Sequence, residues 1–184
     1  MSAPELSEQA LVERAKRDPE AFGQLYDIYF PRIYSFIYRR AGDQATAEDL
    51  TSETFLKVLR SIGQYQYTGQ PFSAWLFRIA TNVVTDHFRR SRGVETLTDR
   101  LPVPDGAPGP EEAALREDRR EAILRALAEL TPEQQDVVLL RFQQGFRLKE
   151  IAGLRGKTEG AVKALMFRAL HSLRAKLEER GVRS

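Results

Sequence analysis

Apolar residues recur at helical spacing along almost the whole chain, and no stretch keeps the alternation of apolar and polar residues that marks a β-strand. A clear example begins at Pro19, where Phe22, Leu25, Tyr29 and Ile33 form one broad apolar face. The pattern predicts an all-α fold in which amphipathic helices pack their apolar faces together.

One segment interrupts this pattern between residues 93 and 115. Its composition blocks helix propagation and offers little apolar surface to bury. The residues responsible are Pro102, Pro104, Gly106, Pro108, Gly109 and Pro110. The sequence therefore predicts two small helical domains, residues 1–92 and 117–184, joined by a flexible Pro/Gly-rich linker over residues 93–116.

Local capping signals predict where the first helices begin and end. Ser7 is expected to cap the first helix, and Asp18 the second, with Pro19 at its first position. Gly42 is expected to end the second helix. Thr46, followed by acidic residues, has the spacing of a capping box and predicts the start of a third helix.

A fourth helix is predicted over residues 75–90, ending in Arg89 and Arg90 where cations complement the helix dipole. Within it, Asp86 and His87 are neighbours and therefore point to different faces of the helix. No further ligands accompany them, so we predict no metal site there.

The second domain carries the spacing of a helix-turn-helix. Thr131 with Gln134 predicts a strong helix start, and a short helix is expected over residues 148–154. Gly156 then turns the chain before a long helix, in which Ile151 and Val162 are expected to share the core. The second helix of such a motif enters the DNA major groove. A plain helical hairpin with a solvated basic face remains the alternative.

Composition narrows the function classes. The 184 residues are 42% hydrophobic and 29% charged, with a sequence pI of about 9.0, no cysteine and two histidines. These values predict a soluble cytoplasmic protein without disulfides, metal or cofactor, and no motif predicts an enzyme. No apolar run approaches the ~20 residues of a membrane span, and the N-terminus does not have the pattern of a signal peptide.

Five segments, taken in order, resemble the extracytoplasmic-function sigma factors of bacterial RNA polymerase. In the first domain these are 18–22 (DPEAF), 47–55 (AEDLTSETF) and 75–82 (WLFRIATN), which resemble the second region of that family. In the second domain they are 130–134 (LTPEQ) and the stretch 150–170, which resemble its fourth region. The resemblance covers nearly the whole chain, with the linker in the expected place.

The resemblance implies a non-enzymatic subunit that binds core RNA polymerase and directs promoter recognition, DNA melting and transcription initiation. It implies that Asp49, Glu53 and Phe55 dock on the polymerase. From the residues alone, Asp49 and Glu53 also suit the start of their own helix, and Phe55 also suits a core position.

By the same resemblance, one loop and the following helix hold the minus-ten element of promoter DNA. Aromatic rings there suit stacking on unpaired bases, amides suit base edges and arginines suit phosphates. The expected residues are Tyr65, Tyr67, Gln70, Phe72, Trp75, Arg78, Asn82, Arg89 and Arg90. Trp75 also fits a core position, because Leu76 and Ile79 accompany it at helical spacing.

The helix-turn-helix is implied to bind the minus-thirty-five element. The residues assigned to that contact are Lys149, Thr158, Gly160, Lys163, Phe167 and Arg168. Many relatives have Ser-Arg directly after the lysine, whereas this chain has Ala164 and Leu165, so the promoter sequence of relatives does not transfer.

Two other functions compete with this interpretation. A stand-alone helix-turn-helix regulator would use the second domain but leave the acidic helix and aromatic loop of the first without a task. A decoy would bind polymerase or an anti-sigma factor without starting transcription. The expected partners are core RNA polymerase and promoter DNA, and an anti-sigma factor is a further candidate partner.

Overall fold

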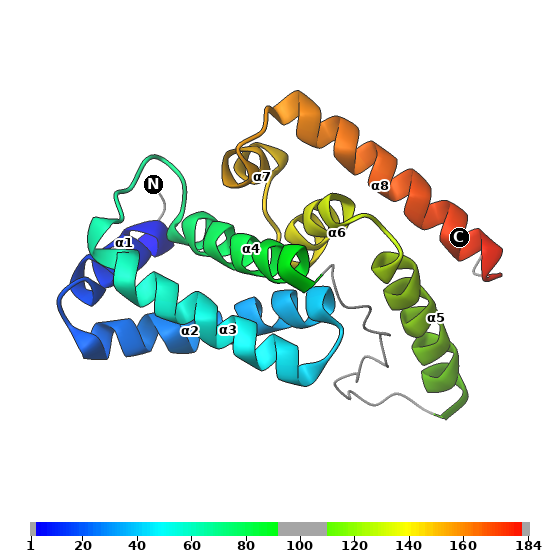
Figure 1. Cartoon of the computed structure of the whole chain (residues 1–184), viewed down its shortest axis with the longest axis horizontal. Helices are drawn as coiled ribbons and strands as arrows, with labels where there is room; N and C mark the ends of the chain where they lie inside the picture. Colours follow the sequence, from blue (N-terminus) through cyan, green and yellow to red (C-terminus); the bar gives the residue numbers. More distant parts are fainter. Residues whose placement is uncertain (1–2, 92–109, 182–184) are drawn as a thin grey trace.

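The computed structural model describes residues 3–91 and 110–181, and these residues are helical without a β-strand (Figure 1). This confirms the predicted all-α class. The helices are α1 Ala3–Ala15, α2 Pro19–Ala41, α3 Gln44–Ser61, α4 Phe72–Ser91, α5 Pro110–Ala128, α6 Pro132–Val138, α7 Leu148–Arg155 and α8 Glu159–Glu179. A 3₁₀ turn, Ile62–Gln64, follows α3, and a π-helical turn, Leu139–Gln143, follows α6.

Several predicted caps are present. The Asp18 carboxylate accepts from the backbone N–H of Glu20 at 3.0 Å, and Gly42 ends α2 with φ of 86°, a left-handed conformation that glycine adopts without steric cost. Thr131 and Gln134 form the predicted capping box at the start of α6. Local chemistry thus sets these helix ends.

Two predicted caps are wrong. α1 begins at Ala3, so Ser7 lies inside the helix. α3 begins at Gln44, because Asp43 is its N-cap and accepts from the backbone N–H of Thr46 at 2.8 Å. Aspartate caps at least as well as threonine, and the earlier of two competent residues starts the helix.

The first domain is a bundle of α1 to α4 around an apolar core (Figure 1). Ile33, Phe36 and Ile37 of α2 are fully buried, and the Phe36 ring meets the Phe77 ring of α4 edge-on at 5.5 Å. Burying each such side chain contributes roughly 1.5–3 kcal/mol. Burial of the α2 face therefore holds α4 in place.

The second domain packs α6, α7 and α8 around Leu140, Ile151 and Val162, each fully buried. Ile151 and Val162 share this core as predicted.

α5 lies against α8, and Glu129, just after α5, pairs with Lys176 of α8 at 2.9 Å. α5 begins at Pro110, so residues 110–116 of the predicted linker are helical; proline suits the first helical position, which needs no N–H donor. Residues 92–109 lie outside the described residues.

The two domains are in contact. α7 lies against α4, and the Phe77 ring of α4 meets the Phe146 ring of the second domain at 5.3 Å (Figure 1). Both domains contribute to one continuous cluster of buried apolar residues. In this conformation the helix-turn-helix is therefore docked on the first domain.

Candidate nucleic-acid and protein interface

Three aromatic rings organise the loop before α4. Tyr65 lies 5.3 Å from Phe72 and 5.1 Å from Trp75, and Phe72 lies 5.4 Å from Trp75, measured between ring centroids. Tyr65 and Phe72 are only 7% and 2% exposed, whereas Trp75 is partly exposed. Burial, the largest cause, raises the pKa of Tyr65 to about 12, so its hydroxyl stays neutral. Of the four rings predicted for the minus-ten contact, Tyr65 and Phe72 are thus buried and support Trp75, because packing against neighbouring rings covers them, whereas Tyr67 is exposed.

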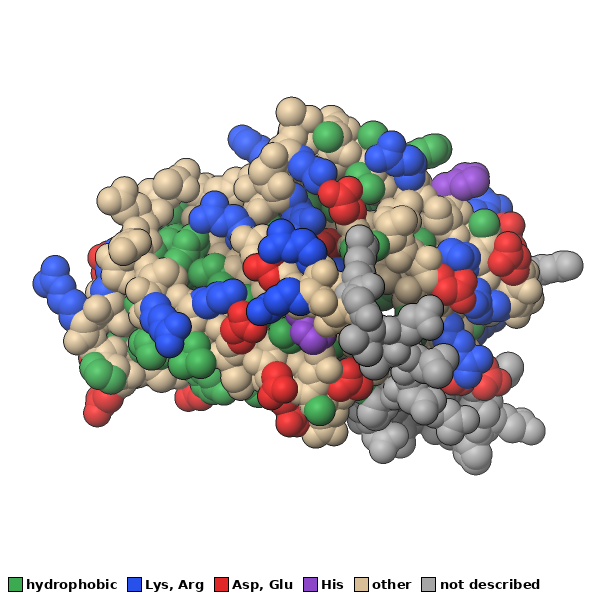
Figure 2. Space-filling view, in the orientation of Figure 1, with side chains coloured by type: hydrophobic (Ala, Val, Ile, Leu, Met, Phe, Trp, Pro, Cys, Tyr) green, Lys and Arg blue, Asp and Glu red, His purple; other side chains and the backbone are tan. Residues whose placement is uncertain are grey.

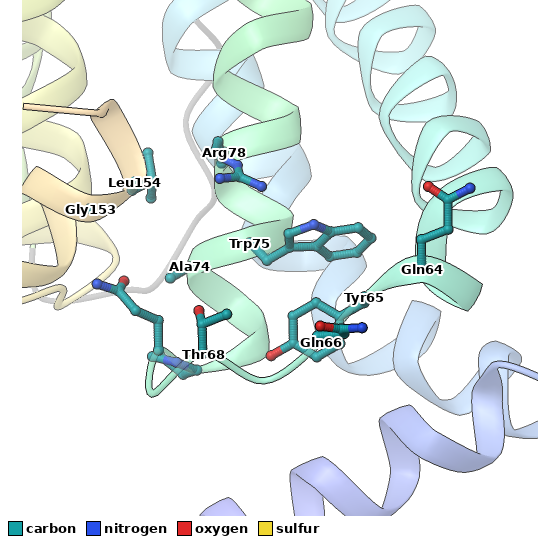
Figure 3. Close-up of a pocket in the computed structure, with 11 residues that line it drawn as sticks. Gln64, Tyr65, Gln66, Thr68, Ala74, Trp75, Arg78, Gly153 and Leu154 are labelled. Atoms are coloured by element: carbon teal, nitrogen blue, oxygen red, sulfur yellow. The ribbon is translucent and has the colours of Figure 1, made fainter.

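A pocket of about 470 Å³ opens beside Trp75. Figure 3 shows Trp75 and Tyr65 side by side on one wall, with Arg78 on α4 above them and Gly153 and Leu154 of α7 on the opposite side. The remaining lining residues are Gln64, Gln66, Thr68, Gln70, Pro71 and Ala74. An aromatic wall with amide groups around it suits a planar, polar-edged ligand such as a nucleobase.

The predicted polar residues of α4 share one face of the helix. At 100° per residue, Trp75, Arg78, Asn82 and Arg89 lie within about 60° of one another. Arg78, Asn82 and Arg89 are exposed, and Arg89 pairs with Asp86 at 3.1 Å. Arg90 is also exposed and donates to the backbone carbonyl of Asp86. The face leads from the pocket along α4 as a row of cations and an amide, a pattern that suits a nucleic-acid strand.

The helix-turn-helix has the predicted local geometry. Gly156 has φ of 63° between α7 and α8, and the Thr158 hydroxyl accepts from the backbone N–H of Ala161 at 3.2 Å. Thr158 is therefore an N-cap, whatever else it contacts. The cap fixes the direction in which α8 leaves the turn.

The candidate DNA-binding residues of α8 are on its surface. Gly160, Lys163 and Phe167 lie within about 60° of one another around the helix axis. Phe167 is 73% exposed, and Lys163 pairs with Glu159 at 2.8 Å. Arg168 and Lys149 are also exposed. The predicted residues of α8 therefore lie together on its solvent-facing side, with the Phe167 ring beside the cations.

The predicted protein-binding residues of α3 separate into two groups. Asp49 is exposed, and Glu53 is partly exposed and pairs with Lys57 at 2.9 Å. Phe55 is buried and packs on Tyr26 with ring centroids 4.6 Å apart. Six residues of helix rotate Phe55 by about 240° from Asp49, which agrees with the core position that the sequence also indicated for it.

Sequence reasoning missed two residues of the same surface. Leu56 and Leu59 are about half exposed on α3, and Leu56 lies within about 60° of Asp49 and Glu53 around the axis. The signal was present, because the seven-residue step from Asp49 to Leu56 keeps a helical face. α3 therefore presents apolar and acidic side chains together to solvent.

The charges divide over the surface. Figure 2 shows Lys and Arg side chains gathering over α4 and α7, and several Asp and Glu side chains along the lower edge where α2 and α3 run. Arg78 of α4 belongs both to the pocket lining and to this cationic row.

Within residues 3–91 and 110–181, no helix is both long and apolar enough for a membrane span, and no three His, Cys, Asp or Glu side chains group as metal ligands.

Two family descriptions match the chain. Residues 25–94 match Sigma-70 region 2, and residues 120–173 match Sigma-70, region 4. The first covers most of α2 to α4, and the second covers the helix-turn-helix.

Curated relatives carry the same assignment. The chain is 48% identical over 166 residues to the ECF RNA polymerase sigma factor BldN of Streptomyces coelicolor, covering 89% of this chain and 63% of BldN. It is 34% identical over 163 residues to the RNA polymerase sigma factor CarQ of Myxococcus xanthus, covering 87% of this chain and 91% of CarQ. It is 34% identical over 160 residues to the ECF RNA polymerase sigma factor SigL of Mycobacterium tuberculosis, covering 86% and 89%.

Solved structures share the fold. CnrH in complex with the cytosolic domain of CnrY aligns with a TM-score of 0.71 at 23% identity, covering 94% of this chain and 97% of that chain. RpoE of Bartonella quintana, in complex with the anti-sigma factor NepR, aligns with a TM-score of 0.71 at 23% identity, covering 85% and 96%. With both family regions matched in order, and with relatives matched over most of their length, the chain belongs to the extracytoplasmic-function family of RNA polymerase sigma factors.

Proposed function

We propose that this sigma factor directs core RNA polymerase to promoters through three surfaces: the α4 face with its pocket, the α8 face, and the acidic, leucine-bearing face of α3. The observation that carries the proposal is the pocket beside Trp75, continued along α4 by Arg78 and Asn82. Sigma factors are not enzymes, and we propose that this one acts by binding alone, without a cofactor, in the cytoplasm where polymerase works.

At the minus-ten element, we propose that Trp75 stacks on a base flipped from the duplex. Phe72 and Tyr65 hold the indole in place, and amides such as Gln70 contact the base edge. Base stacking on an aromatic ring is worth about 1–3 kcal/mol, which offsets part of the cost of opening a base pair. Exposed Tyr67 and the arginines Arg89 and Arg90 then hold the flanking strand.

At the minus-thirty-five element, we propose that α8 lies in the major groove. Gly160 has no neighbouring atom within 4 Å of where a side chain would begin, so the helix start is open to close approach of DNA. Phe167 suits contact with a thymine methyl group, while Lys149, Lys163 and Arg168 suit phosphates. This division gives Phe167 sequence preference and the cations affinity.

For polymerase docking, we propose Asp49, Glu53, Leu56 and Leu59. Burial of the two leucines supplies affinity, and the carboxylates supply orientation. Phe55 supports this surface from below through its packing on Tyr26. An anti-sigma factor is a further proposed partner, because CnrH was solved with the CnrY cytosolic domain and RpoE with NepR.

Transcription in vitro tests the proposal. Core RNA polymerase is incubated with a genomic fragment library, with and without this protein, and new RNA start sites are mapped. We expect starts preceded by a shared two-part motif. Polymerase binding without any start would favour the decoy, and sequence-specific duplex binding without polymerase binding would favour the stand-alone regulator.

Variants separate the surfaces. Leu56→Asp is expected to weaken polymerase binding at least tenfold, whereas Ala175→Asp, which adds the same charge to an exposed position of α8, is the matched control. Asn82→Ala is expected to retain polymerase binding and to lose starts. If Leu56→Asp, Ala175→Asp and Asn82→Ala all lost polymerase binding to the same extent, the assignment of separate surfaces would be contradicted.

A further inference from the structure

The two domains are joined by a buried ion pair. Arg40, near the end of α2, donates from Nε to the Asp136 carboxylate of α6 at 2.7 Å, and the two side chains are 3% and 1% exposed. Arg155 of α7 pairs with the other oxygen of Asp136 at 3.3 Å. Burial raises the pKa of Asp136 above its ordinary value, while the charges of Arg40 and Arg155 oppose that rise.

The Arg40 guanidinium has partners in both domains. Arg40 also donates from Nη1 to the Gln135 side chain at 2.6 Å, and its guanidinium lies 5.5 Å from the centre of the Phe88 ring. Gln135 in turn donates to the backbone carbonyls of Ala128 and Leu130. While the domains are docked, the guanidinium is shielded from water and depends on these partners, so removal of one side of the ion pair leaves an uncompensated buried charge in the interface.

A second set of contacts lies next to it. Arg32 of α2 donates to the side-chain and backbone oxygens of Gln144 at 3.2 and 3.3 Å, and Gln143 donates to the Ser35 hydroxyl at 2.5 Å. Both glutamines lie at the end of the π-helical turn Leu139–Gln143. Such turns are rare and are often found at functional sites. Here the turn brings two amides onto α2.

The docked domain closes one side of the minus-ten pocket. Gly153 and Leu154 of α7 line the pocket opposite Trp75 (Figure 3). The Gln70 side chain occupies the space that a Cβ at position 153 would need, so glycine permits this close approach. DNA entering the pocket along the α4 face would meet α7.

The distance between promoter elements is incompatible with this arrangement. Elements at minus ten and minus thirty-five lie about 25 base pairs apart, or about 85 Å along B-form DNA. A compact chain of this length has a radius of gyration of about 16 Å. Residues 92–109 can span up to about 60 Å when fully extended, so the sequence between α4 and α5 permits the domains to separate.

We propose that the chain alternates between this closed conformation and an open one, and that the Arg40–Asp136–Arg155 network is the latch that holds the helix-turn-helix domain across the minus-ten pocket. The existence of the latch stands on the contacts alone. Its effect on transcription rests on the proposed function. Any partner that binds the separated domains, polymerase included, works against the latch.

Fluorescence energy transfer tests the latch without polymerase. The chain has no cysteine, so Thr85→Cys on α4 and Lys149→Cys on α7, both exposed and on helices that contact each other across the two domains, accept a dye pair at defined positions in the full chain. We expect high transfer in the otherwise unchanged protein. Arg40→Gln should raise the ratio of low-transfer to high-transfer molecules at least tenfold, because Asp136 keeps Arg155 while the contact between domains is lost.

Two further variants separate loss of the latch from a general loss of ion pairs or hydrogen bonds. Lys176→Gln removes an ion pair to Glu129 inside the second domain and should leave the transfer unchanged. Gln144→Ala removes the second set of contacts and should give a smaller shift in the same direction. Circular dichroism checks that each variant remains helical. Should Arg40→Gln unfold the chain, Arg40→Lys decides, because it keeps the buried charge but loses the planar guanidinium that donates to both Asp136 and Gln135. Low transfer before any substitution, or no shift in folded variants, would overturn the latch.

A cross-link connects the latch to transcription. Ser35→Cys with Gln143→Cys, joined by a short bis-maleimide, fixes the closed conformation. We expect the cross-linked protein to lose at least tenfold in transcription starts, while the same double variant left unlinked keeps them. Full activity after cross-linking would overturn the closed state as an inhibited form. An inactive unlinked protein with a working latch in the transfer experiment would instead count against the proposed function.

Discussion

The two proposed DNA-binding surfaces are built in different ways. On α8 the candidate residues are exposed along one helix, and the buried side chains beneath them, such as Val162, belong to a different face. At the minus-ten pocket, support and contact are mixed, because Tyr65 and Phe72 are buried while neighbouring Trp75 is partly exposed. On α8, a residue can therefore be changed to alter DNA binding without altering stability. At the pocket, a change in a supporting ring is expected to alter both.

The largest expected effect lies on the coupled side of this comparison. Phe72→Ala should lower the free energy of unfolding by about 3–5 kcal/mol, because it removes a buried ring that contacts Tyr65, Trp75 and Tyr29. Urea denaturation measures the change. Tyr67→Ala, at an exposed ring of the same loop, is the control and should change stability by less than about 0.5 kcal/mol. If Phe72→Ala kept the stability of the unchanged protein and lost only DNA binding, the pocket would not couple binding with stability.

On α7 and α8 the two roles should separate. Ile151→Ala should cost about 2–5 kcal/mol of stability, since the side chain is fully buried between the helices. Phe167→Ala should leave stability within about 0.5 kcal/mol and weaken promoter binding by the holoenzyme. Thermal unfolding and a promoter-binding titration measure the pair. Destabilisation of several kcal/mol by Phe167→Ala would show that the α8 face is also structural.

A smaller effect should distinguish the two residues that compete to start α3. Asp43→Ala should cost about 1 kcal/mol, because its carboxylate satisfies the backbone N–H of Thr46. Thr46→Ala should cost less than that, because Thr46 lies inside the helix. Urea denaturation of the two variants side by side gives the order, and the reverse order would restore Thr46 as the cap.

Features that depend on residues close together in the chain could be predicted from the sequence. Caps, helix faces and the helix-turn-helix depend on residues within a few positions of each other, so Asp18, Thr131 and Gly156 could be interpreted from local spacing. The exposed face of α8 was predictable for the same reason. Where a local rule failed, at Ser7 and Thr46, the helix simply began earlier.

Contacts between distant residues had no such signal. Arg40 and Asp136 are 96 positions apart, and nothing near either residue marks it as buried. The burial of Tyr65 and Phe72 likewise depends on ring contacts with Tyr29 of α2 and Trp75 of α4, which residue spacing within the loop does not predict. The pocket and the interface between domains therefore required the structure, whereas the position of Leu56 beside Asp49 could have been predicted from helical spacing.

The smallest expected change in stability, and the sharpest for the α8 face, concerns Lys163. Lys163→Gln should leave the free energy of unfolding within about 0.5 kcal/mol, because Lys163 and its partner Glu159 are both exposed. If Lys163 neutralises one phosphate, the slope of log affinity against log salt for holoenzyme on promoter DNA should become shallower by about 0.9. Arg174→Gln is the matched control, since Arg174 lies about three turns further along α8 and pairs with Glu178. An unchanged slope for Lys163→Gln, or an equal change for Arg174→Gln, would mean that affinity arises from the general charge of α8 and not from the part of the helix around Phe167.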